Sequence, residues 1–271
     1  MTMTRRSVRI LMGLLLMPTA MLCPSCRRGQ GTGLAVVGST SVQPFAEMLA
    51  EEFQKKHPDL SVEVQGGGST AGIQALANGM AEIGMCSREL NKEEAKKFTP
   101  ITIARDGLAI VVHPSNPING LTRGQIRDIF SGLVTNWRQV GGPDAPIWPI
   151  TREEGSGTRE AFEKLVMGDR EIARRALTQE SNGSVHELVR HDPDGVGYMS
   201  LGLVGKDLKP LTIDGVAPCA AHVLDGTYTL ARPFLFVVRG TPSPLAQRFI
   251  DFVRSPKGQH LLEKEGLVRV Q

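Results

Sequence analysis

Several absences narrow the function of this chain before any motif is considered. Aromatic residues make up only 5% of the 271 residues, and cysteine occurs four times. The sequence has no G-x-S-x-G elbow, no G-K-[ST] phosphate loop and no H-E-x-x-H motif, so it lacks the usual patterns of serine hydrolases, P-loop nucleoside triphosphatases and zinc proteases. The six histidines are scattered along the chain, and each is interpreted as a surface or loop residue.

The N-terminus is typical of an exported protein. Met1–Arg9 carries three arginines and no acid, and the apolar run Ile10–Leu22 follows it. That run has the length of a signal-peptide core and is too short to span a membrane. The pattern up to Cys26 resembles a bacterial lipoprotein signal. We therefore expect residues 1–26 to be a signal peptide that ends in a lipidated cysteine, with plain cleavage nearby as the alternative.

The rest of the chain has no excess of positive or negative charge. The whole sequence has 31 Lys and Arg against 28 Asp and Glu, and residues 1–25 hold three arginines and no acid, so 28 of each remain. This balance gives no indication of nucleic-acid binding. Cys86 and Cys219 form no C-x-x-C pair, and whether they form a disulfide stays open.

Hydroxyl residues follow the first predicted strand. The apolar run Leu34–Val37 ends at Gly38, and Ser39, Thr40 and Ser41 come directly before a run with helical spacing. Thr40 and Gln43 match a capping box. Three consecutive hydroxyls are more than a helix cap needs, which favours a second use for them.

The same arrangement recurs twice. Leu60–Gln65 alternates like a strand and precedes a glycine run with Ser69, where a helix is predicted over 71–78. Glu82–Cys86 is a short strand followed by Ser87 and Arg88. Helix N-termini carry partial positive charge and unpaired N–H groups, so these junctions are suited to anions.

The strongest candidate is Thr151–Arg159, which reads T-R-E-E-G-S-G-T-R between an apolar run and a predicted helix. Ser156 and Thr158 add hydroxyl donors, and Gly157 lets the backbone approach a ligand closely. Arg152 supplies a charged fork of donors. Together they predict an oxyanion receptor.

The remaining pattern predicts alternating strands and helices. We expect two strands within Ile101–His113 broken at Asp106-Gly107, a basic helix over Glu171–Leu177, a short helix over Ser184–Val189 and a long strand over Thr229–Val238. The overall class is α/β. A competing interpretation uses Gly66–Ala71, which matches a dinucleotide fingerprint and would make the chain a dinucleotide-binding enzyme.

Five motifs occur in a specific order: G-S-T-S-V-Q-P-F, V-Q-G-G-G-S-T-A-G, E-I-G-M-C-S-R-E-L, D-G-L-A-I-V-V-H-P-S-N-P and R-E-E-G-S-G-T-R. Over residues 33–270 the chain resembles the phosphate-binding proteins of bacterial phosphate-specific ABC transporters. The resemblance implies a two-lobed periplasmic-binding-protein fold with two crossover strands and a ligand cleft between the lobes. It places lobe one at 33–112 and 228–271 and lobe two at 113–227.

The resemblance also implies a phosphate site. Its members are Ser39, Thr40, Ser41, Ser69, Ser87, Arg88, Arg152, Ser156, Gly157 and Thr158. One branch of the family has an aspartate at the third loop, where it accepts the phosphate proton, and this chain has Ser87-Arg88 instead. We hypothesise that Glu153, Glu154 or Glu89 is the acceptor here.

The resulting prediction is a non-enzymatic receptor, without cofactor or metal, that binds inorganic phosphate. It would deliver phosphate to the permease subunits and ATPase of an ABC importer, as a monomer that binds no nucleic acid and meets the membrane only through a lipid anchor. The alternatives are a sensor or scavenger of the same fold, and a receptor for another tetrahedral oxyanion.

Overall fold

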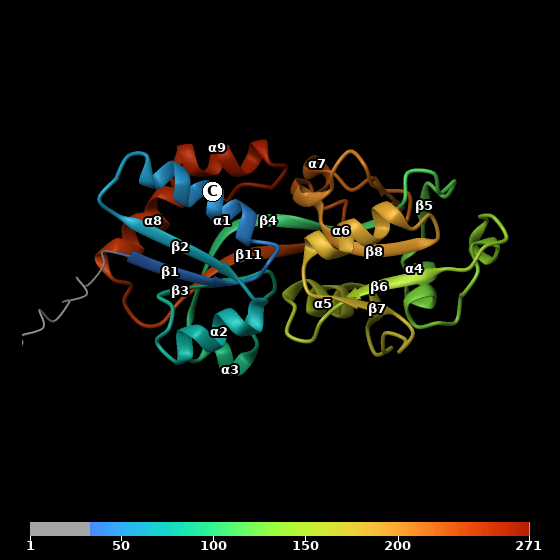
Figure 1. The fold of residues 1–271 in the computed structure, drawn as a ribbon, viewed down its shortest axis with the longest axis horizontal. Coiled ribbons are helices and arrows are strands. Elements are labelled where there is room, and N and C mark those ends of the chain that lie inside the picture. Colours follow the sequence, from blue (N-terminus) through green and yellow to red (C-terminus); the bar gives the residue numbers. More distant parts are fainter. Residues whose placement is uncertain (1–32, 271) are drawn as a thin grey trace, which may run out of the picture. The chain divides into compact units, whose positions relative to one another are not determined.

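A computed structural model describes residues 33–270 (Figure 1). The signal peptide and lipidation predicted for residues 1–26 lie outside the described residues. Within them, strands and helices alternate along the chain, so the predicted α/β class is confirmed. No helix in this part of the chain is long and apolar enough to cross a membrane.

One sheet runs through the structure in the order β2-β1-β3-β11-β4-β8-β6-β7, with β9 paired to β4. Its first half contains three parallel strands joined to an antiparallel pair. These strands are β1 (Gly33–Gly38), β2 (Ser61–Gly66), β3 (Ile83–Cys86), β4 (Thr99–Val112) and β11 (Ala231–Val238).

The second half of the sheet contains β8 antiparallel to β4, with β6 and β7 parallel beyond it. A separate two-stranded sheet pairs β5 with β10. These strands are β5 (Gly120–Leu121), β6 (Trp148–Arg152), β7 (Leu177–Gln179), β8 (Gly195–Ser200), β9 (Lys209–Pro210) and β10 (Thr212–Ile213).

Strand β4 joins the two halves (Figure 1). It pairs with β11 up to Gly107 and with β8 from Leu108 onward. The predicted break at Asp106-Gly107 was therefore wrong. The strand continues and only its partner changes. Gly107 is tightly packed, since a Cβ there would lie 3.0 Å from Leu201 Cδ2.

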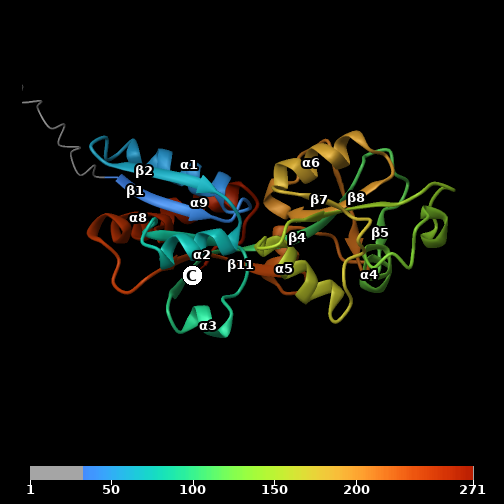
Figure 2. The same ribbon diagram turned by 60° about the horizontal axis from the view of Figure 1, so that its bottom comes forward.

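Helices cover both faces of each half (Figures 1 and 2). Apolar side chains of α1, α8 and α9 pack on one face of the first half, and those of α2 pack on the other. In the second half, α4 and α5 pack on one face and α6 on the other. The helices are α1 (Gln43–Gln54), α2 (Ser69–Ala77), α3 (Lys92–Ala95), α4 (Arg123–Phe130), α5 (Gly157–Phe162), α6 (Asn182–His191), α7 (Ala220–Leu224), α8 (Pro244–Arg254) and α9 (Pro256–Lys264). Shorter helical turns are η1 (Trp137–Val140), η2 (Glu163–Met167) and η3 (Leu201–Leu203).

Three local predictions were wrong. The basic helix over 171–177 is absent, because the segment from Glu171 forms turns that lead into β7. Helix α6 begins earlier than expected and is capped by Ser181, whose hydroxyl accepts the N–H of Ser184. Helix α1 has no side-chain cap, so the capping box predicted for Thr40 does not form and its hydroxyl is available for another contact.

Candidate functional site

Three loops of the first half meet at one edge of the sheet. Strands β1, β2 and β3 are parallel neighbours, so their carboxyl ends lie together. The loops after them carry Ser41, Ser69 and Ser87. Gly38 ends β1 in close contact with β3, since its φ is +145° and an added Cβ would lie 2.3 Å from the Met85 carbonyl oxygen.

Five buried hydroxyls form what we call the hydroxyl cluster: Ser39, Ser41, Ser69, Ser87 and Thr158. Each residue is at most 2% exposed. Ser39 donates to Ser87 Oγ at 2.9 Å, and the Ser69 and Ser87 oxygens lie 3.5 Å apart. Ser41 Oγ and Thr158 Oγ1 lie 2.7 Å apart. Since Thr158 comes from the second half and the serines from the first, the cluster spans the two halves.

The segment after β6 brings the second half to the cluster. Ser156 caps α5 by accepting the N–H of Arg159 at 3.3 Å. Gly157 begins the helix so close to the first half that an added Cβ would lie 2.2 Å from Ser69 Oγ and 2.8 Å from Ser87 Oγ. A second contact across the halves is the bond from the Thr70 N–H to the Gly155 carbonyl, at 3.1 Å.

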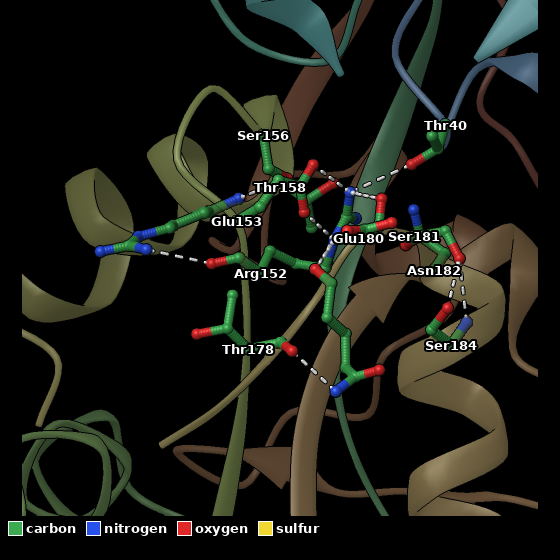
Figure 3. Close-up of polar contacts among 12 residues, drawn as sticks. Thr40, Arg152, Glu153, Ser156, Thr158, Thr178, Glu180, Ser181, Asn182 and Ser184 are labelled. Atoms are coloured by element: carbon green, nitrogen blue, oxygen red, sulfur yellow. Dashed lines mark hydrogen bonds and ion pairs between the residues drawn. The ribbon is translucent and has the colours of Figure 1, made fainter. Parts of the chain in front are cut away.

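Arg152 lies at the end of β6 and is 1% exposed (Figure 3). Its Nη2 donates to Thr40 Oγ1 at 3.1 Å, to Glu153 at 2.9 Å and to the Glu180 carbonyl at 3.2 Å. Its Nε donates to Glu153 and to the Gln179 carbonyl. Its Nη1 is buried and has no hydrogen-bond partner among the residues that the structure describes.

Tyr198 fixes the backbone from which Arg152 projects. Its hydroxyl accepts the N–H of Arg152 at 3.2 Å and lies 2.7 Å from Thr151 Oγ1. Burial raises the pKa of Tyr198 to about 12, so the phenol stays neutral at physiological pH. Its ring stacks on Phe162, with the centroids 4.0 Å apart.

The structure places Arg88 beside carboxylates. It forms two hydrogen bonds to Glu94, at 2.7 and 2.9 Å, and an ion pair to Glu160 at 2.7 Å. No hydrogen bond joins it to the hydroxyl cluster within residues 33–270. Because Glu160 belongs to α5, Arg88 links the two halves.

The acids proposed as proton acceptors lie in different places. Glu153 is bound to Arg152, whereas Glu89 and Glu154 are exposed. A buried acid that is linked to the cluster through Arg232 was not predicted. Asp106 is 1% exposed and pairs with Arg232 at 2.9 Å. Burial raises the pKa of the Asp106 carboxyl, and the charge of Arg232 opposes that rise.

Sequence reasoning also missed Asn182 and Arg232. Asn182 Nδ2 donates to Ser41 Oγ at 2.8 Å, and Arg232 Nη2 donates to the same oxygen at 3.3 Å. Arg232 stands within the A-R-P-F segment, where a charged residue in an otherwise apolar strand was a usable signal. Asn182, within S-N-G, gave no signal beyond a loop or helix cap.

The geometry opposes the dinucleotide interpretation of Gly66–Ala71. The N–H groups of Gly67 and Gly68 both donate to the Gly38 carbonyl, at 2.9 and 3.0 Å, so they are not available to a pyrophosphate. A Cβ on Gly66 would lie 2.1 Å from Gln43 Oε1. The Gln43 side chain therefore occupies the space beside Gly66, and the Gly38 carbonyl occupies the N–H groups of Gly67 and Gly68.

Cys86 and Cys219 are both free thiols. No group of three or more His, Cys, Asp or Glu side chains within residues 33–270 could hold a metal ion.

The sequence matches the model of the PBP superfamily domain over residues 25–257. Among curated proteins, the phosphate-binding protein PstS of Bacillus subtilis (strain 168) is 30% identical over 226 residues, which cover 82% of this chain and 75% of that protein. The PstS of Borreliella burgdorferi is 28% identical over 88% of this chain and 90% of its own length.

The chain is also similar to solved structures of phosphate transport proteins. A candidate phosphate ABC transporter substrate-binding protein from Clostridium perfringens, with bound phosphate, is 39% identical and has a TM-score of 0.86, over 88% of this chain and all of that chain. An ABC-type phosphate transport receptor from Vibrio cholerae is 40% identical, with a TM-score of 0.74 over the same shares.

Proposed function

The chain belongs to the PBP superfamily and to its PstS family of phosphate-binding proteins, and from this membership we propose that it binds inorganic phosphate at the hydroxyl cluster and delivers it to an ABC importer. The single observation that carries the proposal is Nη1 of Arg152. This charged donor is buried without a partner among the described residues. An unpaired buried donor is costly, and an anion would satisfy it.

The proposed ligand set follows the predicted residues. Ser39, Ser69, Ser87 and Thr158 supply hydroxyls, and Ser41 is the hydrogen-bond partner of Thr158. Thr40 holds Arg152, and Gly157 allows the close approach of α5. Ser156 shapes the start of that helix. Charge-assisted hydrogen bonds contribute about 1.5–3 kcal/mol each, so several of them account for tight capture of a dianion.

Hydrogen bonding, more than net charge, would hold the anion. Every buried arginine near the cluster already has a carboxylate partner: Arg152 with Glu153, Arg88 with Glu94 and Glu160, and Arg232 with Asp106. Arg88 therefore enters the proposal as a link that holds the halves closed. Of the three acids suggested as the proton acceptor, Glu153 is retained, because within residues 33–270 its carboxylate alone is bonded to a predicted ligand residue, Arg152.

The remaining parts of the proposal concern the protein's setting. We propose lobes at 33–112 with 228–271 and at 113–227, a lipid anchor at Cys26, and a monomer outside the cytoplasm that contacts permease subunits and an ATPase of the importer. No catalytic step and no nucleic acid enter this function.

Calorimetric titration with phosphate, sulfate and arsenate tests the proposal. The protein is first freed of co-purified anion by partial unfolding and dialysis. Stoichiometric phosphate binding is expected. If the refolded protein gives no heat with any of the three anions, the proposed function is wrong.

A further inference from the structure

The hydrogen bonds of Ser41 determine the direction in which its hydroxyl donates. Asn182 Nδ2 lies 2.8 Å and Arg232 Nη2 lies 3.3 Å from Ser41 Oγ. Both groups are donors. A hydroxyl oxygen has two acceptor lone pairs and one hydrogen, so Ser41 accepts from both and its own hydrogen goes elsewhere.

The orientation of the Asn182 amide is set by its other contact. Its Oδ1 accepts the N–H of Ser200 at 3.1 Å, and a backbone N–H can only donate. The amide nitrogen must therefore face Ser41. Asn182 is 1% exposed, so no exposure to solvent allows the amide to reverse.

Arg232 is fixed in the same way. Its Nε donates to Asp106 Oδ2 at 3.0 Å, and Asp106 Oδ1 accepts the Ser200 hydroxyl at 2.9 Å. Arg232 and Asp106 are register partners on β11 and β4, at the place where β4 passes from one half to the other. The ion pair thus holds the guanidinium against Ser41.

Ser41 donates a hydrogen bond to Thr158. The two oxygens lie 2.7 Å apart, and Ser41 must be the donor of this pair. Thr158 Oγ1 therefore accepts, and its own hydrogen has no acceptor within residues 33–270. Donors in series polarise one another, which strengthens the last one.

We propose that Asn182 and Arg232 are positioning residues that orient Ser41, and through it Thr158, so that the Thr158 hydroxyl donates its hydrogen to the bound anion. The inference rests on the proposed function, since it names how one donor of that site is oriented. It adds an orientation rule: the Thr158 hydrogen cannot be given to Ser41, so it remains available to an oxygen of the anion.

The test is a double-mutant cycle, followed by calorimetric titration with inorganic phosphate. Asn182→Ala is expected to weaken binding about tenfold in the native background and less than twofold in a Ser41→Ala background, because its effect passes through Ser41. Asn116→Ala is the matched control. Asn116 is also buried, at 4% exposure, and accepts a backbone N–H, that of Ile118, at 3.0 Å, but it has no contact with the cluster. It should change affinity less than twofold.

Arg232→Lys is the second variant, for the case in which Asn182→Ala does not fold. Lysine keeps the positive charge beside Asp106 but has no second nitrogen for Ser41, so a similar loss is expected, again only when Ser41 is present. Thermal unfolding of each variant separates folding defects from binding defects.

An equal loss in the native and Ser41→Ala backgrounds would overturn the inference, as would unchanged affinity in the native background. Binding of phosphate by the native protein together with either result leaves the proposed function intact. No phosphate binding by folded native protein overturns both.

Discussion

Gly157→Ala is the substitution that most sharply tests the close approach of the two halves. The added Cβ would lie 2.2 Å from Ser69 Oγ, 2.8 Å from Ser87 Oγ and 3.0 Å from Ser69 Cβ. Ser69 is fully buried, and its oxygen accepts the N–H of Ser87 at 3.1 Å. Rotating it away would leave that N–H unpaired, which costs about 1–3 kcal/mol.

Separating the halves relieves the overlap at a lower cost in free energy than rotating Ser69, because Gly157 and Ser69 belong to different halves. We therefore expect phosphate affinity to fall by about 2–3 kcal/mol, roughly 30- to 150-fold, while the melting temperature without ligand changes by no more than a few degrees. Calorimetry measures the affinity, and thermal unfolding measures the stability.

Gly124→Ala is the control for this prediction. Gly124 also lies in the first turn of a helix, α4, but its added Cβ meets only Thr122 Oγ1 at 3.8 Å, an ordinary contact. It should leave affinity unchanged. If Gly157→Ala binds phosphate within threefold of the native protein, the reasoning that the cluster needs this approach is refuted.

Three further predictions concern the surroundings of the cluster. Arg152→Gln should lower phosphate affinity by about 2–4 kcal/mol in calorimetry, and a loss under threefold would mean that Arg152 is not a ligand. Tyr198→Phe should lower the free energy of unfolding in urea by about 1 kcal/mol, because Thr151 loses its partner; unchanged stability would contradict this. Arg88 lowers the pKa of Glu94, so their pair stabilises the fold above the ordinary glutamate pKa of about 4.3 and less as the pH falls through the lowered value. Glu94→Gln should therefore cost more stability at pH 7 than at pH 3, and equal costs at both pH values would refute the coupling.

Much of the site could be predicted because it depends on local sequence. A hydroxyl in the loop after a strand lies at the carboxyl end of the sheet whatever the rest of the fold, and the structure does bring Ser39, Ser69 and Ser87 together. Thr158 followed from the same logic in the second half. That these residues bind phosphate stays a prediction.

The missed residues depend on pairing across long sequence separations. Asp106 and Arg232 are neighbours only because β4 and β11 pair in one register, and no local pattern reports that register. Asp106-Gly107 has the composition of a turn, yet tertiary pairing keeps it extended. Arg88 was expected to face the anion, but the capping box of α3 positions Glu94 to bind it, which local charge alone could not show.

The most direct test of the central claim is a crystal structure of the protein with bound arsenate, located by the anomalous scattering of arsenic. The account predicts one arsenic peak among the five residues of the hydroxyl cluster, with Nη1 of Arg152 within hydrogen-bond distance of an arsenate oxygen. A peak elsewhere, with the cluster unchanged and Nη1 still unpartnered, would contradict it.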